Sequence, residues 1–273
     1  MKRIQMMTHS EYLSYFNLAS DPFSREIDTE QLLTLPSIEQ YMDSAELLIE
    51  TRGIGVVTGK SGTGKSTLIR LLIDRLQPGL YKSYYVCHTS VGLVEFYTHL
   101  CSVFGLTPGH RRASMFRAIK EHVLTMHSSS RIHPVLIIDE AHLLNNDILA
   151  EIRLLTNFHT DSLNALTVLL CGNEQLPRRF GLSILESFAS AITVTISVEP
   201  LQKEETFTYI ESRLSACGAG PPLITKNALE LIHQASGGIM RVVGTITTAS
   251  LRKAFLAKHQ QVEAEHVQSV LQR

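Results

Sequence analysis

Residues 59–66 constrain the fold of this chain more than any other part of its sequence. They read Gly-Lys-Ser-Gly-Thr-Gly-Lys-Ser and match the pattern G-x-x-x-x-G-K-[ST] at each required position. Residues 55–58 before them have the pattern of a short buried strand, and residues 67–73 after them that of an amphipathic helix. In that order, the loop N–H groups and the positive end of the helix surround a phosphate. The sequence therefore predicts a phosphate-binding loop.

The end of this loop supplies the side chains expected to act on a nucleotide. Lys65 is expected to reach the β- and γ-phosphates, and the Ser66 hydroxyl to bind Mg²⁺. The residues assigned to nucleotide binding are Gly59, Lys60, Ser61, Gly62, Thr63, Gly64, Lys65, Ser66, Thr67 and Asp139.

A second motif lies downstream, where the apolar residues 135–138 are followed by Asp139 and Glu140. This is the pattern of a parallel strand buried on both faces, with acids at its carboxyl end. Asp139 is expected to hold Mg²⁺ together with Ser66, and Glu140 to orient and deprotonate the attacking water. Such a run is common by itself. Paired with the phosphate loop, it favours an enzyme that hydrolyses ATP or GTP.

Composition sets the outer limits. Of the 273 residues, 44% are hydrophobic and 19% charged, which suits a packed core. No apolar run approaches the ~20 residues of a membrane span, and the start lacks the apolar stretch of a signal peptide. A cytoplasmic protein without a membrane partner is therefore expected. The four cysteines share no metal-ligand spacing. With a net charge of −1, nucleic-acid binding would require a local basic patch.

The chain divides into three expected parts. Residues 1–36 form a lead-in segment, residues 37–198 alternate between helix and strand, and residues 199–273 contain helices only. The expected strands are 54–58, 83–87, 134–139, 166–171 and 192–197. This order predicts an α/β P-loop fold in which helices sandwich a parallel sheet and a helical lid follows at the carboxyl end.

Position alone leaves two further residues ambiguous. Asn173 follows the fourth expected strand, where its side chain would face a γ-phosphate or serve as a turn residue after Gly172. Arg241 lies one turn into a helix after two glycines, and a solvent-exposed helix residue is the simpler interpretation.

Taken together, these motifs resemble those of the ExeA/GspA-type AAA+ ATPases over nearly the whole chain. The matching segments are 12–18, 21–24, the loop 59–66, 139–142, 151–157, 201–205, 209–214 and 236–241. The resemblance implies ATP as the nucleotide and Mg²⁺ as its metal ion. It also implies that Asn173 and Arg241 are the sensor 1 and sensor 2 residues, so that the catalytic set is Lys65, Glu140, Asn173 and Arg241.

The chain departs from this family at one position. Family members often carry an arginine just before the last core strand, available to a neighbouring subunit, and Ala191 stands there instead. An arginine finger is worth about 10³- to 10⁵-fold in turnover. Either Arg178 or Arg179 replaces it, or hydrolysis is slow and requires a partner. A solvated arginine pair is the third possibility.

The end of the chain favours one functional branch of the family. Secretion-type members continue into a membrane span and a further domain, whereas this sequence stops after the last expected helix at Arg273. Stand-alone versions resemble the TniB, TnsC and MuB group. That likeness implies a homo-oligomer, either ring or helical filament, which assembles on duplex DNA with ATP, regulates a transposase and disassembles on hydrolysis. A secretion ATPase that remodels a protein partner at the membrane is the alternative, and a scaffold that binds ATP without turnover is another.

A basic segment between the second and third strands is the candidate DNA surface. It contains Arg111, Arg112, Arg117 and Lys120. In related DNA-binding ATPases this region faces the central channel, which is what the resemblance implies here. An ordinary solvated helix face is the simpler interpretation of any one of these residues. Repeated along an oligomer, their phosphate contacts would add up to sequence-tolerant, salt-sensitive binding.

Overall fold

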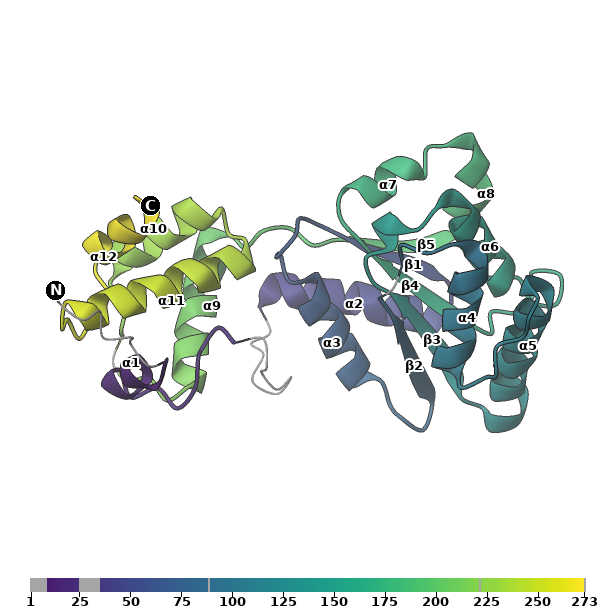
Figure 1. Cartoon of the computed structure of the whole chain (residues 1–273), viewed down its shortest axis with the longest axis horizontal. Coiled ribbons are helices and arrows are strands. Elements are labelled where there is room, and N and C mark those ends of the chain that lie inside the picture. Colours follow the sequence, from purple (N-terminus) through teal and green to yellow (C-terminus); the bar gives the residue numbers. More distant parts are fainter. Residues whose placement is uncertain (1–8, 25–34, 88, 221, 273) are drawn as a thin grey trace. The chain divides into compact units, whose positions relative to one another are not determined.

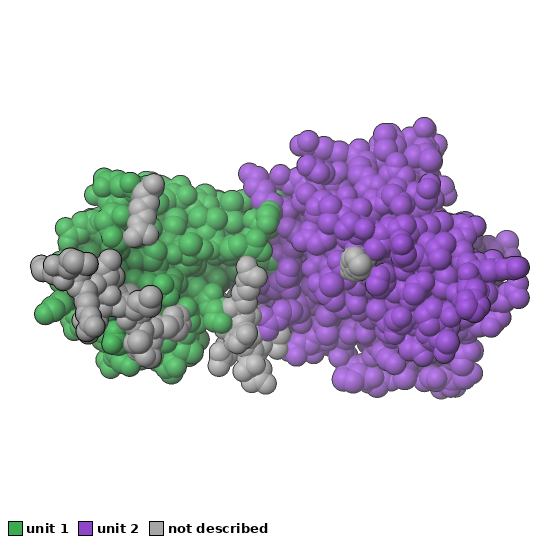
Figure 2. Space-filling model, in the orientation of Figure 1, with its two compact units in different colours: residues 1–37, 61–64, 199–273 green, residues 38–60, 65–198 purple. Residues whose placement is uncertain are grey.

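The computed structural model describes residues 9–24, 35–87, 89–220 and 222–272. These residues form two compact units (Figure 2): unit 1 takes those within 1–37, 61–64 and 199–273, and unit 2 takes those within 38–60 and 65–198. Residues 1–8 and 25–34 of the expected lead-in lie outside the described residues.

Unit 2 is built on a five-stranded, fully parallel sheet with the order β2-β3-β4-β1-β5 (Figure 1). The strands are β1 Ile54–Thr58, β2 Tyr81–Val86, β3 His133–Ile138, β4 Thr167–Cys171 and β5 Ile192–Ser197. The residues of β1, β3 and β4 are all buried, as expected for parallel strands covered on both faces. Strands β2 and β3 begin slightly earlier than expected, and β3 ends one residue before Asp139. The pairing nevertheless continues to that residue, because Asp139 N donates to Val86 O at 2.8 Å.

Helices cover both faces of this sheet. The α-helices of unit 2 are α2 Pro36–Thr51 (from Ile38 onward), α3 Lys65–Arg75, α4 Leu93–Phe104, α5 Arg112–Thr125, α6 Asn146–Thr156, α7 Gln175–Arg179 and α8 Glu186–Ala189. It also contains the π-helix η2 Met126–Ser130 and two 3₁₀ helices, η3 Ala141–Leu143 and η4 Ser183–Leu185. Side chains of α4, α5 and α6 form one core with Val56, Leu136 and Val168. On the other face, a Cβ at Gly55 would lie 2.2 Å from Leu48 of α2, so glycine there lets the helix pack closely.

Unit 1 contains α1 His9–Tyr15 and four helices after the sheet, α9 Lys203–Ala216, α10 Lys226–Ser236, α11 Met240–Leu256 and α12 Ala264–Leu271. Tyr12 and Phe16 are buried in one core with apolar residues of α9, α10 and α11. The described lead-in therefore packs with the C-terminal helices rather than standing as a separate segment.

Candidate nucleotide site

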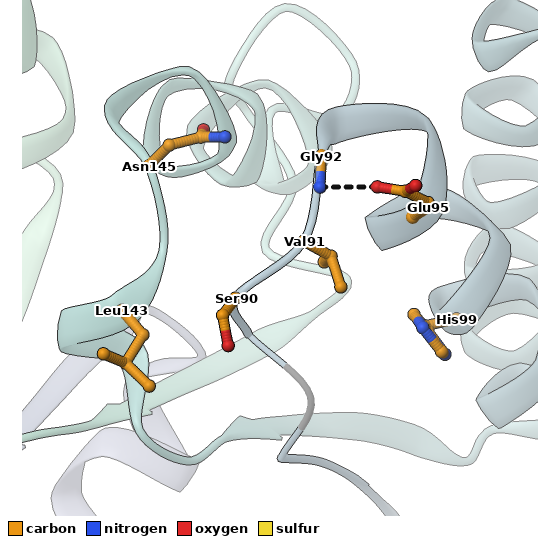
Figure 3. A pocket seen from close by; sticks show the side chains of 7 residues that line it. All are labelled: Ser90, Val91, Gly92, Glu95, His99, Leu143 and Asn145. Carbon is orange, nitrogen blue, oxygen red and sulfur yellow. Dashed lines mark hydrogen bonds between the residues drawn. The ribbon is translucent and has the colours of Figure 1, made fainter.

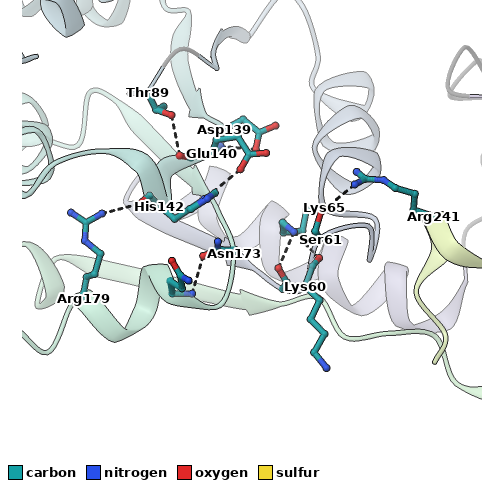
Figure 4. Close-up of polar contacts among 12 residues, drawn as sticks. Lys60, Ser61, Lys65, Thr89, Asp139, Glu140, His142, Asn173, Arg179 and Arg241 are labelled. Atoms are coloured by element: carbon teal, nitrogen blue, oxygen red, sulfur yellow. Dashed lines mark hydrogen bonds and ion pairs between the residues drawn. The ribbon is translucent and has the colours of Figure 1, made fainter. Parts of the chain in front are cut away.

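Lys65 closes the expected phosphate loop onto its own backbone. It begins α3, and its Nζ donates to the carbonyl oxygens of Gly59 and Lys60, each at 2.9 Å (Figure 4). Ser66, which follows it on the first turn, is exposed. Hydrogen bonds from an ammonium to anionic phosphate oxygens are stronger than those to neutral carbonyls. The side chain therefore holds partners that a nucleotide can replace.

Residues 61–64 group with unit 1, where they contact the start of α11. Arg241 Nη1 donates to Ser61 Oγ at 3.1 Å, and Arg241 N donates to Gly62 O at 3.1 Å. Gly62 has a φ of +88°, and a Cβ there would lie 2.8 Å from Arg241 Cβ. Arg241 therefore contacts two residues of the loop. The sequence alone could not distinguish this arrangement from a solvent-exposed arginine on a helix.

The turn after β3 holds Glu140 in a strained conformation. Its φ of +50° lies in the left-handed region, which is costly for a residue with a side chain. Two hydrogen bonds fix it: Glu140 N donates to Asp139 Oδ1 at 2.8 Å, and Thr89 Oγ1 donates to Glu140 O at 3.0 Å. The exposed carboxylate lies 3.3 Å from His142 Nδ1. Strain held by such contacts is typical of functional turns.

Two neutral groups orient the Asp139 carboxylate. Tyr85 Oη donates to its Oδ2 at 2.7 Å, while Oδ1 accepts the Glu140 N–H. Both donors are neutral, so they orient the carboxylate without cancelling its charge, and carboxylate oxygen is a preferred Mg²⁺ ligand. Asp139 and the Ser66 hydroxyl are the residues that would hold the ion.

Asn173 lies two residues after the end of β4. Its Oδ1 accepts from Gln175 N at 2.9 Å, which fixes the side chain at the start of α7. This is the turn geometry that the sequence allowed, and it leaves the amide NH₂ as the donor group. Asn173 can therefore be a turn residue through its Oδ1 and still offer its NH₂ group as a donor to a γ-phosphate.

The arginine pair separates into two different environments. Arg178 is exposed, whereas Arg179 is partly buried and donates to His142 O at 3.1 Å and to Asn146 Oδ1 at 2.5 Å. Burial lowers the pKa of Arg179. Arg179 therefore joins α7 to the segment after Glu140 within one chain. Ala191 lies just before β5 and packs against the core.

The basic segment is also divided. Arg111, Arg112 and Arg117 are all exposed, but only Arg112 forms an ion pair with α6, where its Nη1 lies 2.5 Å from Glu151 Oε1. Lys120 Nζ donates to carbonyl oxygens at the end of α6 and lies 4.4 Å from the Phe158 ring centroid. Burial lowers the pKa of Lys120. Lys120 and Arg112 therefore tie α5 to α6.

Three residues near the site carry no motif. Tyr85 at the end of β2 and Cys171 at the end of β4 lie beside Asp139, one on each side of β3. Thr89, in the loop after β2, contacts Glu140. Burial and the nearby Asp139 carboxylate raise the pKa of Cys171. The signal that identifies them is strand order, which the sequence did not supply.

A cavity of about 530 Å³ opens beside this turn (Figure 3). Its lining residues are Ser90, Val91, Gly92, Glu95, His99, Leu143 and Asn145. None of them belongs to the expected nucleotide set. Glu95 Oε2 accepts from Gly92 N at 2.6 Å, so one wall is the capped start of α4.

Among the described residues, a cluster with metal-ligand chemistry lies on unit 1. The ligand atoms of His259, Glu265 and His266 lie within 4.8 Å of one another. However, Glu263 N donates to His266 Nδ1 at 2.9 Å, so the proton of the neutral ring sits on Nε2. A protonated nitrogen offers no lone pair to a metal. The geometry therefore favours a helix-capping role for His266.

The sheet, the phosphate loop and the acids after β3 define a P-loop NTPase fold of the AAA+ type, which confirms the predicted fold class. Residues 48–180 match the family described as "AAA domain". The chain is 29% identical over 248 residues to General secretion pathway protein A of Aeromonas hydrophila, covering 89% of this chain and 45% of that protein. It thus spans about half the length of this curated relative.

Two solved structures share the fold. Cdc6p from Pyrobaculum aerophilum aligns with a TM-score of 0.69 and 16% identity, over 90% of this chain and 68% of that chain. Drosophila ORC bound to DNA aligns with a TM-score of 0.70 and 21% identity, over 99% and 68%. In the described part of this chain, no helix combines the length and apolar character needed to cross a bilayer.

Proposed function

We propose that this chain is an Mg²⁺-dependent ATPase that assembles on duplex DNA as a homo-oligomer and regulates a transposase. The turn at Glu140 is the observation that supports hydrolysis. It holds an exposed carboxylate next to Asp139, the residue proposed to bind the metal ion. Water attacks the γ-phosphorus, Glu140 accepts the water proton, and the bond to the β–γ bridging oxygen breaks to leave ADP and phosphate. When bound, Mg²⁺ neutralises charge on the phosphates.

The other proposed site residues act on the phosphates. Lys65 exchanges its two carbonyl partners for β- and γ-phosphate oxygens, while Asn173 and Arg241 donate to the γ-phosphate. Exposed Arg178 is the candidate that acts on the site of a neighbouring subunit. Arg179 is less suited to that role because its guanidinium is already bound within its own chain.

DNA binding is supported by two exposed basic residues, Arg111 just before α5 and Arg117 within it. Arg111 and Arg117 have side chains available for phosphate contacts, so the proposed surface centres on these two. A structure with this fold, Drosophila ORC, was determined bound to DNA. Few contacts per subunit make binding weak until ATP joins several subunits along a duplex.

The role with a transposase rests on the sequence resemblance to the TniB, TnsC and MuB group. A second candidate is supported by the 29% identity to General secretion pathway protein A, which extends over 89% of this chain. In that case the ATPase would remodel a protein partner of a secretion system, and DNA would not be its ligand.

Binding of a labelled random-sequence duplex distinguishes the two. We expect binding with ATP, little with ADP, and none for Lys65→Ala, while Glu140→Gln binds with ATP and does not release. ATP hydrolysis without duplex binding under any nucleotide would overturn the DNA proposal and favour the secretion-type candidate.

A matched pair of variants tests the DNA surface. Arg117→Glu should weaken duplex binding and flatten its salt dependence, whereas Lys258→Glu makes the same charge change at an exposed position in unit 1 and should retain binding. Equal loss in both variants would indicate a general charge effect and contradict the placement on α5.

A further inference from the structure

The register of the sheet brings two polar side chains, those of Tyr85 and Asp139, to one place. Tyr85 of β2 pairs with Ile137 of β3, so the pleat puts Asp139 on the same face, one diagonal step away. Such diagonal neighbours are about 7–8 Å apart at Cα and within reach of an aromatic side chain. Tyr85 Oη spans this distance and donates to Asp139 Oδ2 at 2.7 Å.

We propose that Tyr85 is a positioning residue for Mg²⁺ bound with nucleotide, acting through the carboxylate of Asp139. This inference rests on the proposed ATPase function, which assigns Asp139 to the metal site. Sequence motifs do not indicate Tyr85, because it lies in a strand with two other tyrosines, Tyr81 and Tyr84.

The surroundings orient the Asp139 carboxylate. The Tyr85 hydroxyl donates to Oδ2 from the neighbouring strand β2, which fixes the direction of the carboxylate. On the other side of β3, Cys171 of β4 lies beside the same carboxylate. With the Glu140 N–H on Oδ1, the carboxylate is held by neutral groups from three directions.

The Tyr85 bond leaves Asp139 available to the ion. Each carboxylate oxygen has two lone pairs, so Oδ2 can accept the Tyr85 hydroxyl and still face a metal or its bound water. Partners that orient a ligand in this way typically change metal affinity by about 10- to 100-fold when removed. We therefore expect Tyr85→Phe to weaken metal binding while leaving the nucleotide pocket intact.

Tyr84→Phe is the matched control. Tyr84 immediately precedes Tyr85 on β2 and is buried on the opposite face, where its hydroxyl lies 3.3 Å from Met126 Sδ. Each variant loses one hydroxyl from the same strand. Loss of stability alone would therefore appear at least as strongly in the buried Tyr84 variant.

The test measures Mn²⁺ bound to the full chain by electron paramagnetic resonance in the presence of saturating ADP. Tyr85→Phe should raise the Mn²⁺ dissociation constant by about tenfold or more, with Tyr84→Phe at the wild-type value. The affinity for a fluorescent ADP analogue in EDTA should be the same in all three proteins.

The outcomes separate this inference from the proposed function. Unchanged or tighter Mn²⁺ binding in Tyr85→Phe, with normal binding by the wild type, overturns the role of Tyr85 only. Failure of the wild type to bind the nucleotide or Mn²⁺ with ADP overturns the proposed ATPase function itself.

Discussion

Arg179 Nη1 donates a hydrogen bond to the His142 carbonyl oxygen at 3.1 Å. Together with the bond from Nη2 to Asn146 Oδ1, this contact fastens α7, which begins just after Asn173, to the segment that follows Glu140. The two proposed catalytic residues are therefore supported by one guanidinium.

Replacing Arg179 by alanine should impair both stability and turnover. Loss of a charge-assisted pair of hydrogen bonds should lower the free energy of unfolding by about 1–3 kcal/mol. The loosened Glu140 segment should lower kcat by roughly 10- to 100-fold. ATP affinity should change little, because Arg179 does not belong to the phosphate loop. Phosphate release and urea unfolding measure these effects, and wild-type turnover in a correctly folded Arg179→Ala would contradict the supporting role.

Arg178 should behave differently because its side chain is exposed. If it acts on the neighbouring subunit, Arg178→Ala alone should hydrolyse ATP about 10³-fold or more slowly, with normal stability. Mixing it with the Lys65→Ala variant should restore activity, since a hybrid interface then combines an intact loop with an intact Arg178. Absence of recovery, in mixtures shown to co-assemble, would exclude Arg178 as the missing arginine.

The paired glycines before α11 predict a large difference between two similar substitutions. Gly237 and Gly238 both have positive φ, at +57° and +73°, so alanine is strained at either position. A Cβ on Gly238 would also lie 2.1 Å from the Leu201 carbonyl oxygen, whereas a Cβ on Gly237 meets nothing within 4 Å. Gly237→Ala should cost about 1–2 kcal/mol, and Gly238→Ala should cost several times more. Hydrogen exchange of α11 amides measures the difference, and equal costs would show that the Leu201 contact relaxes freely.

Motif and pattern were sufficient to predict the parallel sheet. The five strands lie within a few residues of their expected positions, because buried parallel strands are read directly from apolar runs such as 135–138. The acids at Asp139 and Glu140 follow from the same pattern, since a carboxylate at a strand end is a local feature.

Contacts between distant segments could not be predicted. Lys120 and Arg117 lie on one helix and carry the same charge. Only Lys120 contacts the end of α6, through a backbone carbonyl oxygen and the Phe158 ring. Tyr85 meets Asp139 because β2 and β3 are neighbours in register, and no sequence motif encodes that register. The roles of Arg178 and Arg179 likewise depend on which of them faces His142.

His133 predicts how unit 2 responds to acid. It is 3% exposed at the start of β3, with Nε2 2.8 Å from Thr167 Oγ1, and burial lowers its pKa to about 4. The unfolded chain, with an ordinary histidine pKa near 6.5, binds more protons than the folded chain between these values. Stability from this residue is therefore complete above pH ~6.5 and falls as the pH drops toward ~4, by about 3 kcal/mol in total.

The variant His133→Gln should remove this part of the pH dependence, because glutamine can hydrogen-bond Thr167 but does not titrate. Exchange of the buried β3 amides, compared between variant and wild type at each pH from 7 to 4, reports the free energy of unfolding of the unit that contains His133. The wild type should lose stability relative to His133→Gln by up to about 1.4 kcal/mol per pH unit below pH ~6. His159→Gln, at an exposed turn, should follow the wild type. If the stabilities of His133→Gln and the wild type changed in parallel with pH, His133 would bind protons equally well in the folded and unfolded chain.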